Sequence, residues 1–332
     1  MNAQHHPRPT LATLARRALL RLGALGRARR SLSILIYHRV LPQADPLFPD
    51  EVDAARFEQQ MAWLKQGFHV MPLAEAARRL RAGTLPPRAA CVTFDDGYAD
   101  NAEIALPILQ RHGLAATFFV ATGFLNGGRM WNDTVIELVR RAPGPRLELA
   151  ALGYGSHAIG SDAERSAAIH ALLDQLKYLE PELRLAEVDK LRGALGLALP
   201  DDLMMNTEQV RQLHAAGMEI GAHTVHHPIL ASMDEHGARQ EIARGKAVLE
   251  EMTGAPVRLF AYPNGKPGRD YHAAHVALAR ELGFEAAVCT AWGAAGPETD
   301  PFQLPRFTPW DRKPLGFTLR LLHNLYRPGQ TV

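Results

Sequence analysis

The stretch Thr93-Phe94-Asp95-Asp96-Gly97-Tyr98 places two adjacent carboxylates directly after an apolar, β-prone run, residues 89–94. Successive side chains of a strand point to opposite faces, so a regular strand cannot aim both aspartates at one point. A strand that ends at Gly97 can, because the chain turns there. Carboxylates held together repel, and a cation relieves that repulsion. The motif therefore predicts a metal ligand beside a general base, with an acidic turn after a buried strand as the alternative.

A second polar cluster follows the short strand-like segment 218–222. His223 and His227 are four residues apart, but a glycine before the pair and a proline after it argue against a regular helix. We expect one histidine at a strand end and the other in the loop beyond it, and we interpret His226 as an ordinary surface or core residue. A catalytic zinc typically has three protein ligands and one open position. Asp96 and the two histidines would supply three ligands.

The two motifs resemble those of the polysaccharide deacetylases, carbohydrate esterase family 4, which carry the NodB homology domain. The resemblance extends over residues 34–307. It implies an α/β fold, a deformed (β/α) barrel, that binds one divalent metal, most often zinc, with cobalt or nickel as alternatives. It also implies metal-assisted hydrolysis of the N-acetyl group of an amino sugar. By this resemblance Asp96, His223 and His227 are the metal ligands and Asp95 is the catalytic base.

The third motif of that family is matched less completely. Phe260-Ala261-Tyr262-Pro263-Asn264-Gly265 resembles a Phe-Ala-Tyr-Pro-Tyr-Gly version, with Asn264 in place of the second tyrosine. In the family the backbone N–H at that position helps to hold the oxyanion, and a backbone donor survives a change of side chain. The resemblance thus implies oxyanion or substrate binding by Tyr262, Pro263 and Asn264. The alternative is a strand-to-turn junction, since Pro-Asn-Gly is strong turn chemistry.

The general acid needs a different source from the one that many family members use. They carry a Leu-x-His motif near the end of the domain, where this chain has Leu304-Pro305-Arg306. Tyr37-His38 ends an apolar segment at the start of the domain, which resembles the subgroup that includes the biofilm poly-N-acetylglucosamine deacetylases. In that subgroup an N-terminal Tyr-His supplies the acid, so we predict His38 as the acid, with a structural histidine as the alternative. Arg306 is a candidate to pair with Asp95 and orient it, against the alternative of a surface arginine.

These roles describe an N-deacetylase in which metal-activated water attacks, Asp95 takes its proton and His38 protonates the leaving amine. The expected substrate is an N-acetylated polysaccharide, oligosaccharide or lipid-linked glycan. Two other classes remain open: a metal hydrolase for another amide or ester, and a non-catalytic carbohydrate-binding protein on the same fold. Cys91 and Cys289 lie in apolar runs and fit buried small hydrophobes rather than nucleophiles.

Composition indicates one large folded domain. The chain has 332 residues, of which 47% are hydrophobic and 22% charged, enough for a substantial core. Its formal net charge of +2 gives no case for a nucleic-acid partner. Strand and helix patterns alternate, as is typical of α/β folds. We expect strands at 33–38, 68–71, 89–94, 115–122, 218–223, 257–262 and 285–290, and helices at 54–66, 73–82, 100–112, 163–179, 185–195, 208–216, 235–253, 270–282 and 315–326.

The segment at about 131–205 breaks this rhythm, and we expect it to be an insertion over the mouth of a catalytic domain spanning 31–312. The segment Trp131-Asn132-Asp133 at its start is a candidate for contact with the sugar, as is Tyr98 beside the carboxylates; a buried tryptophan is the alternative. Residues 313–332 are expected to form a C-terminal helix and tail.

The first thirty residues form a distinct basic segment. They contain seven arginines and no acidic residue, with apolar residues between them, which predicts a basic amphipathic helix. The arginines interrupt any secretory apolar core, and no run reaches the roughly 18 apolar residues of a membrane span. We expect a cytoplasmic protein whose extension either contacts an anionic inner-membrane surface or is a solvated or domain-packed segment. A lipid-linked or nucleotide-linked amino sugar would then be the substrate.

Overall fold

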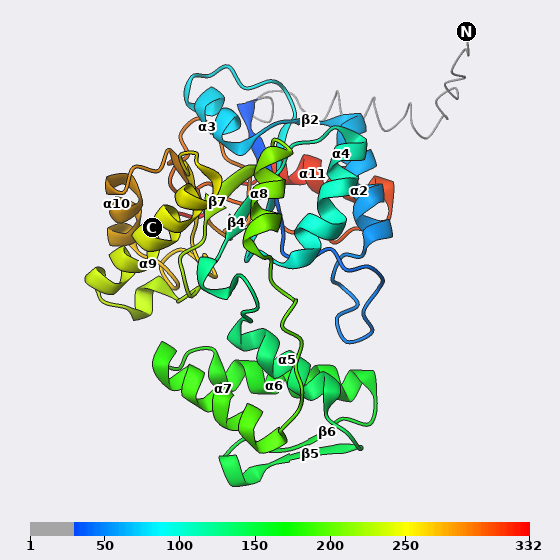
Figure 1. The fold of residues 1–332 in the computed structure, drawn as a ribbon. Coiled ribbons are helices and arrows are strands. Elements are labelled where there is room, and N and C mark those ends of the chain that lie inside the picture. The colour runs from blue at the N-terminus through cyan, green and yellow to red at the C-terminus, as the bar shows by residue number, and fades with distance from the viewer. Residues whose placement is uncertain (1–29) are drawn as a thin grey trace.

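The computed structural model describes residues 30–332, so the expected N-terminal helix lies outside the described residues. Its centre is a parallel sheet in which the strands lie in the order β1-β3-β4-β7-β8-β9, with β2 beside β3 (Figure 1). The strands are β1 Leu32–Tyr37, β2 His69–Val70, β3 Ala89–Phe94, β4 Thr117–Val120, β7 Glu219–Ala222, β8 Leu259–Ala261 and β9 Ala286–Val288. Each of them overlaps a strand expected from the sequence.

Helices cover the outside of this sheet and also lie close to their expected positions. They are α2 Ala54–Gly67, α3 Leu73–Arg81, α4 Leu106–His112, α8 Thr207–Ala215, α9 Glu235–Thr253, α10 Ala273–Glu281 and α11 Pro314–Tyr326. Gly113 and Gly254 end α4 and α9 with left-handed φ angles of 61° and 66°, which a residue without a Cβ adopts at little cost. The helix expected over 100–112 begins with a π-helical turn, Asn101–Ala105.

The sheet curls into a deformed (β/α) barrel, the fold class that the sequence predicts. An irregular segment, residues 304–307, bridges its two outer strands. Leu304 pairs with Val288 of β9, and Phe307 pairs with Leu35 of β1. Arg306 therefore lies in the segment that completes the ring.

Alternate strand residues face the inside and the outside of the barrel, as strand geometry requires. Leu32 and Ile34 of β1 belong to an inner cluster that also contains Leu73 and Leu80 of α3. Because Leu73 N donates to Glu219, the first residue of β7, α3 covers the amino ends of the strands. The carboxyl ends are thus left for a functional site.

A larger outer cluster lies between the sheet and the surrounding helices. Residues 313–332, expected as a helix and tail after the domain, contribute α11 to it through Phe317, Leu321 and Leu325. The C-terminal helix therefore packs against the outside of the sheet as part of the barrel domain.

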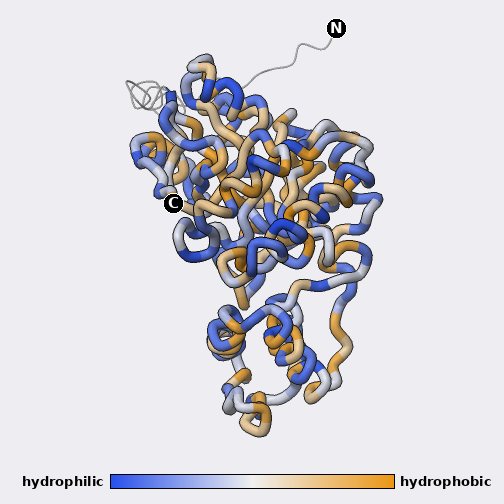
Figure 2. The backbone as a smooth tube through the Cα atoms, turned by 90° about the vertical axis from the view of Figure 1, so that its left-hand side faces the viewer, coloured by the Kyte–Doolittle hydropathy of each residue, from blue (hydrophilic) through white to orange (hydrophobic). Residues whose placement is uncertain are grey.

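A separate lobe lies beyond the barrel (Figure 1). It consists of α5 Trp131–Arg141, β5 Arg146–Leu149, β6 Gly155–Ala158, α6 Asp162–Leu176 and α7 Pro181–Leu195. These elements fall within the segment 131–205 that we expect to be inserted, and they have their own apolar cluster. Figure 2 shows hydrophobic stretches along the backbone of this lobe as well as along the barrel. The antiparallel pair β5–β6 was not expected, because each strand has only four residues and both have exposed faces.

Of the helices within residues 30–332, none combines the length and the apolar character needed to cross a bilayer.

Candidate metal centre and active site

The two aspartates leave β3 in different directions because the chain turns immediately after it. The inward-facing row of β3, which includes Cys91, continues to Asp95 at the carboxyl end. Asp96 and Gly97 have left-handed φ angles of 76° and 93°, which rotate the Asp96 carboxylate toward the same end of the barrel. A Cβ on Gly97 would lie 3.0 Å from Val120 Cγ1 at an already unfavourable φ, so glycine is required there.

The histidine loop follows β7 in the same way. His223 is the first residue after the strand, and Thr224 and His227 adopt left-handed φ angles of 64° and 53°. The chain is therefore not helical here, as the flanking glycine and proline predict. His223 Nδ1 lies 2.7 Å from the carbonyl oxygen of Ala261. Because a carbonyl can only accept, Nδ1 carries the proton and Nε2 presents its lone pair to the barrel end.

Asp96, His223 and His227 come together at this end, with one potential ligand atom from each lying within 4.8 Å of the others. Asp96 Oδ1 is 3.5 Å from His223 Nε2 and 3.4 Å from His227 Nε2. This oxygen is buried and has no hydrogen-bond partner among the described residues. A buried carboxylate oxygen that faces two imidazole nitrogens at 3.4–3.5 Å without a hydrogen bond to either fits a divalent cation.

Two of the three groups have protonation states suited to a metal; for the third, His223, burial is outweighed by Asp96 and Asp95, which raise its pKa. Burial lowers the pKa of His227 to about 4, so this imidazole is neutral at pH 7. Burial opposes ionisation of Asp96, but the neighbouring His223 and His227 outweigh it and hold the pKa of Asp96 well below its usual value. A neutral imidazole and an ionised carboxylate are the forms that coordinate a metal.

Asp95 is held by a buried arginine. Arg306 Nη1 and Nη2 donate to Asp95 Oδ1 and Oδ2, each at 2.7 Å, and Arg306 has no exposed surface. Burial would raise the pKa of Asp95, but the Arg306 guanidinium and His223 outweigh it and lower that pKa. The bidentate geometry fixes the plane of the carboxylate as well as its charge.

Helix α9 supports the histidine loop from outside. Glu241 Oε2 accepts from the backbone N–H groups of Val225 and His226 at 3.0 and 2.8 Å, and its Oε1 lies 2.8 Å from His226 Nδ1. The exposed His226 thus contacts Glu241 and does not join the metal-ligand set, in line with its interpretation as an ordinary residue.

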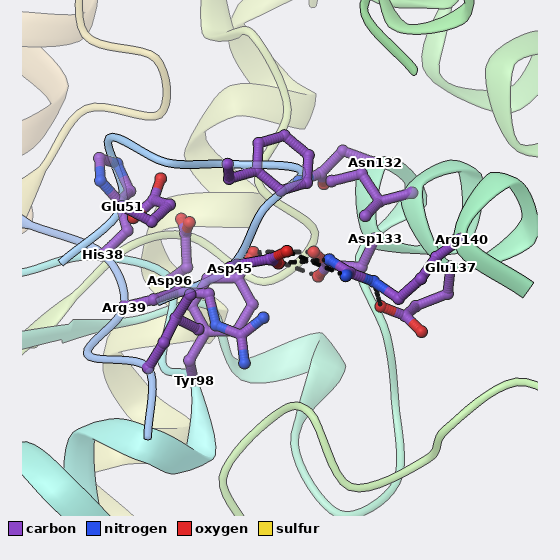
Figure 3. Close-up of a pocket in the computed structure, with 13 residues that line it drawn as sticks. His38, Arg39, Asp45, Glu51, Asp96, Tyr98, Asn132, Asp133, Glu137 and Arg140 are labelled. Atoms are coloured by element: carbon purple, nitrogen blue, oxygen red, sulfur yellow. Dashed lines mark hydrogen bonds and ion pairs between the residues drawn. The ribbon is translucent and has the colours of Figure 1, made fainter. Parts of the chain in front are cut away.

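A cavity of about 320 Å³ adjoins this centre between the barrel and the lobe (Figure 3). His38, Asp96 and Tyr98 line it from the barrel, and Asn132, Asp133 and Arg140 line it from α5. Arg140 Nη2 pairs with Asp45 Oδ2 at 2.6 Å and so links the lobe to the loop after β1. A substrate group in this cavity would contact both parts of the chain.

His38 is exposed in this cavity at the end of β1, and its backbone oxygen accepts from Asn101 Nδ2 at 2.9 Å. Glu51 lies nearby (Figure 3). Burial raises the pKa of Glu51, an effect that His38 opposes. The imidazole therefore faces the space next to Asp96 without being packed into the core.

Asp133, which the sequence offered only as part of the segment Trp131-Asn132-Asp133, lines the same cavity. Tyr98 Oη donates to its carboxylate at 3.1 Å, and the Arg39 guanidinium lies 4.7 Å from the Tyr98 ring. Burial raises the pKa of Asp133 to about 7, assisted by the charge of Asp96 and opposed by Arg39. The only local signal was its place beside Trp131.

Two predicted substrate contacts lie elsewhere. Tyr262 is buried, and its Oη donates to the Phe302 carbonyl at 3.0 Å, so its side chain cannot contact a sugar. The Trp131 ring lies in the lobe under the Arg184 guanidinium, 4.8 Å away. Tyr262 is thus part of the core, whereas Trp131 is half-buried beside Arg184.

Pro263 and Asn264 lie just after β8, at the carboxyl end of the strands, where the predicted role requires them. Pro263 is buried, and Asn264 is partly exposed with a left-handed φ of 57°, a conformation that asparagine tolerates better than most residues. Asn264 O accepts from Thr290 Oγ1 at 2.7 Å, which holds the turn in place.

The curled parallel sheet gathers carboxylates and imidazoles at its carboxyl end, so the protein has the deformed (β/α) barrel class of fold with a polar site at its rim. The polysaccharide deacetylase family model matches residues 82–162 and 189–287, more than half of the chain, and the protein belongs to this family. The unmatched residues 163–188 fall in the lobe, in α6 and the start of α7. The protein is accordingly a polysaccharide deacetylase, a hydrolase of N-acetyl groups, and enzymes of this kind are metal-dependent.

Individual relatives are distant. YxkH of Bacillus subtilis (strain 168), a protein named for the same family, is 21% identical over 277 residues, covering 83% of this chain and 70% of its own. The Streptococcus pyogenes deacetylase PplD, solved in complex with acetate, superposes with a TM-score of 0.58 at 19% identity, over 89% of this chain and 98% of its own. IcaB from Ammonifex degensii superposes with a TM-score of 0.55 at 21% identity, over 89% of this chain and 97% of its own. At such identities the two structures support the fold.

Proposed function

We propose that this protein removes N-acetyl groups from an amino-sugar glycan with one divalent ion held by Asp96, His223 and His227. The observation that carries this proposal is the convergence of these three groups beside a carboxylate, Asp95, whose orientation is fixed by a buried arginine. Two imidazoles, one carboxylate and an open position match a catalytic zinc, with cobalt or nickel as alternatives.

A bound divalent ion would supply Lewis acidity toward the amide carbonyl and toward water. Asp95 is ionised at neutral pH and accepts the proton of the attacking water. The backbone N–H of Asn264 donates to the oxyanion that develops on the acyl carbon, a form of stabilisation that is usually a large part of catalysis. His38, exposed in the cavity, donates a proton to the departing amine, and the products are acetate and a free amino sugar.

The cavity of Figure 3 is the proposed place for the sugar ring. Tyr98, Asn132 and Asp133 line it with groups that can accept from or donate to sugar hydroxyls. Because residues of both the barrel and the lobe line this cavity, the lobe is part of the proposed substrate site.

The decisive experiment is acetate release by the metal-reconstituted full chain. The substrates are chitooligosaccharides, poly-N-acetylglucosamine fragments and nucleotide- or lipid-linked N-acetyl sugars. Asp95→Asn should lower kcat by about 10²–10⁴-fold. Since this change also leaves Arg306 without its charge partner, the melting temperature is measured alongside.

Glu219→Gln is the matched control, because it removes a carboxylate that contacts the start of α3 at the opposite end of the barrel. It should retain turnover. A folded Asp95→Asn protein with wild-type turnover would refute the assignment of the base, and wild-type protein that binds metal but releases no acetate from any substrate would refute the proposed function.

His38 is tested separately through the leaving group. A departing amine needs a proton, whereas a nitrophenolate does not. His38→Asn should therefore slow N-deacetylation by about 10²–10⁴-fold but leave nitrophenyl acetate hydrolysis nearly unchanged. Equal losses on both substrates would contradict the role of acid.

A further inference from the structure

A second cavity, of about 460 Å³, lies between the lobe and the barrel on the side of β7 and β8. Lys177, Tyr178 and Arg184 line it from the lobe, and Ile229, Arg269 and His272 line it from the barrel. Ile229 is two residues beyond His227, and Arg269 is five residues beyond Asn264. This basic cavity therefore opens on the same rim of the barrel as the candidate metal centre.

Arg184 is the most informative residue of the basic cavity. Its side chain is 5% exposed, and burial alone accounts for a lowered pKa of its guanidinium, with no carboxylate contributing. Nη1 donates to the Lys177 carbonyl at 3.0 Å, and the buried Nε has no hydrogen-bond partner among the described residues. A buried cation without a counter-charge is costly, and such cations are normally paired.

Two further cations face the same space. The Arg269 guanidinium lies 4.7 Å from the Tyr178 ring, a contact between the barrel and the lobe, and Lys177 Nζ lies 5.8 Å from that ring within the lobe. Among residues 30–332, none of the ion pairs found within 4.0 Å involves Lys177, Arg184 or Arg269. None of the three side chains thus has a carboxylate partner at this distance, although the Arg184 guanidinium also lies over the Trp131 ring.

The charge of the region is positive overall. Burial lowers the pKa of Lys177, and the charges of Lys266 and Arg269 lower it further, while Asp270 and Asp174 oppose them. Asp270 does not line the basic cavity; it is buried, and its Oδ2 accepts from Lys266 N at 3.0 Å. No carboxylate of the described residues lines the basic cavity itself.

We propose that the basic cavity is an anion subsite, which binds a phosphoryl or carboxylate group carried by the same glycan whose N-acetyl sugar is hydrolysed. The inference rests on the proposed function for its position in the reaction. Arg184 supplies the buried charge, and Lys177 and Arg269 close on the anion from both sides, because guanidinium and ammonium groups donate to oxyanions. The preferred substrate is then an acidic glycan, phosphate-linked or uronate-containing, and a neutral one leaves this charge unpaired.

Binding is tested first, independently of turnover. Inorganic diphosphate is titrated calorimetrically into the metal-reconstituted full chain at low salt. The variant is Lys177→Gln with Arg269→Gln, both at positions with solvent access, so that folding is not at risk. The control is Lys190→Gln with Arg192→Gln, which removes the same charge from the exposed face of α7.

We expect the wild-type and control proteins to bind diphosphate alike and the variant to bind at least about tenfold more weakly, as the loss of two charge-assisted contacts requires. Any diphosphate bound by the metal itself is common to the three proteins. Equal affinity in all three would overturn the proposal.

Turnover then identifies the source of the anion. The substrates are a neutral N-acetylglucosamine tetramer, a hyaluronan tetrasaccharide, UDP-N-acetylglucosamine and a polyprenyl diphosphate-linked N-acetylglucosamine. We expect a higher kcat/KM for one of the three acidic substrates, lost in the variant mainly through KM, with the neutral tetramer unaffected. Preference for the neutral tetramer, or an equal loss on every substrate, would overturn the subsite.

The two proposals fail in different ways. If diphosphate affinity depends on Lys177 and Arg269 but no substrate releases acetate, the anion subsite stands and the proposed function falls. If acetate is released but neither binding nor turnover depends on these residues, the proposed function stands and the subsite falls.

Discussion

At the scale of single residues, the direction of the Asp95 carboxylate depends on Arg306. Two hydrogen bonds of 2.7 Å hold both carboxylate oxygens, and further bonds from Arg306 to Thr93 Oγ1 and Cys289 O hold the guanidinium itself. A buried charge without a partner would destabilise the fold in this position, so Asp95 and Arg306 each offset the cost of burying the other's charge.

Arg306→Lys should retain the charge but lose the two-pronged geometry. We expect kcat/KM to fall about 10²-fold, because the base is misplaced. The acidic limb of the pH–rate profile should also move to higher pH, since a weaker partner lowers the pKa of Asp95 less. Arg320→Lys is the control. Arg320 of α11 forms an ion pair with Asp311 away from the site, so this change should alter neither quantity. An unshifted acidic limb in Arg306→Lys would contradict this account.

Asp133 makes stability depend on pH in a defined direction. Burial raises its pKa to about 7, whereas an unfolded aspartate titrates near ~3.9. Between these values the folded state holds more protons, so this carboxyl makes stability decrease as the pH rises from about 4 to 7. Asp133→Asn cannot titrate and can still accept from Tyr98.

The melting temperature of Asp133→Asn minus that of the wild type should therefore increase from about pH 4 to about pH 7 and then stay constant. Differential scanning calorimetry over this range measures it, with Asp189→Asn on the exposed face of α7 as the control. A difference that is independent of pH would show that Asp133 is not protonated in the folded protein.

At the scale of elements, helix α9 determines the path of the histidine loop. Glu241 accepts from two backbone N–H groups of the loop, and Gly245 lies directly against Thr224. A Cβ on Gly245 would lie 2.7 Å from Thr224 O and 2.8 Å from Thr224 C, both backbone atoms. The close approach of helix and loop therefore needs glycine at this position.

Gly245→Ala should displace the loop even though alanine is the better helix former by about 1 kcal/mol. We expect the metal affinity to fall by about 10–100-fold, as for changes in groups that orient ligands. Metal titration monitored by calorimetry checks it. Gly193→Ala in α7 is the control, because its Cβ would meet nothing within 4 Å, and it should slightly raise stability without changing metal affinity. Unchanged metal affinity in Gly245→Ala would contradict this role.

At the scale of the whole molecule, the candidate metal centre joins distant parts of the chain. Asp96 follows β3, while His223 and His227 follow β7, with β4 between the two strands in the sheet. The lobe is attached nearby at two sides, through Arg140 with Asp45 and through Arg269 over Tyr178. Metal binding is thus expected to stabilise the barrel as a unit.

Removal of the metal with a chelator should lower the melting temperature by several degrees. A ligand at a thousandfold excess over its Kd contributes about 4 kcal/mol to the native state. Asp96→Asn should have a lower melting temperature before the chelator is added, and the chelator should change it little. The melting temperature of Asp45→Asn, a change at the lobe contact, should fall with the chelator as that of the wild type does. A chelator-insensitive wild-type protein would exclude a structural contribution from this site.

Much of the fold was predictable because its signals are local. Apolar runs of four to eight residues, and periodic helices ended by Gly113 and Gly254, identify β and α segments in alternation. The groups Asp95-Asp96 and His223/His227 were visible for the same reason: parallel strands bring their carboxyl ends to one rim, so polar residues at strand ends meet. The β5–β6 pair escaped detection because β5, Arg-Leu-Glu-Leu, alternates over only four residues and β6, Gly-Ser-His-Ala, shows no apolar alternation.

By itself, the sequence determined the strand-and-helix alternation and the set of residues at the strand ends, because both follow from backbone periodicity and turn chemistry within a few residues. The sequence offered Arg306 as a candidate partner of Asp95, but only the tertiary structure decided that the two pair across 211 residues. It likewise decided that Tyr98 contacts Asp133 and that Tyr262 points into the core. It also decided that Arg184 is buried beside Lys177 and Arg269 without a counter-charge. These contacts depend on how the barrel closes and on where the lobe packs against it. Packing between segments that are distant in sequence produces no periodic pattern in the sequence.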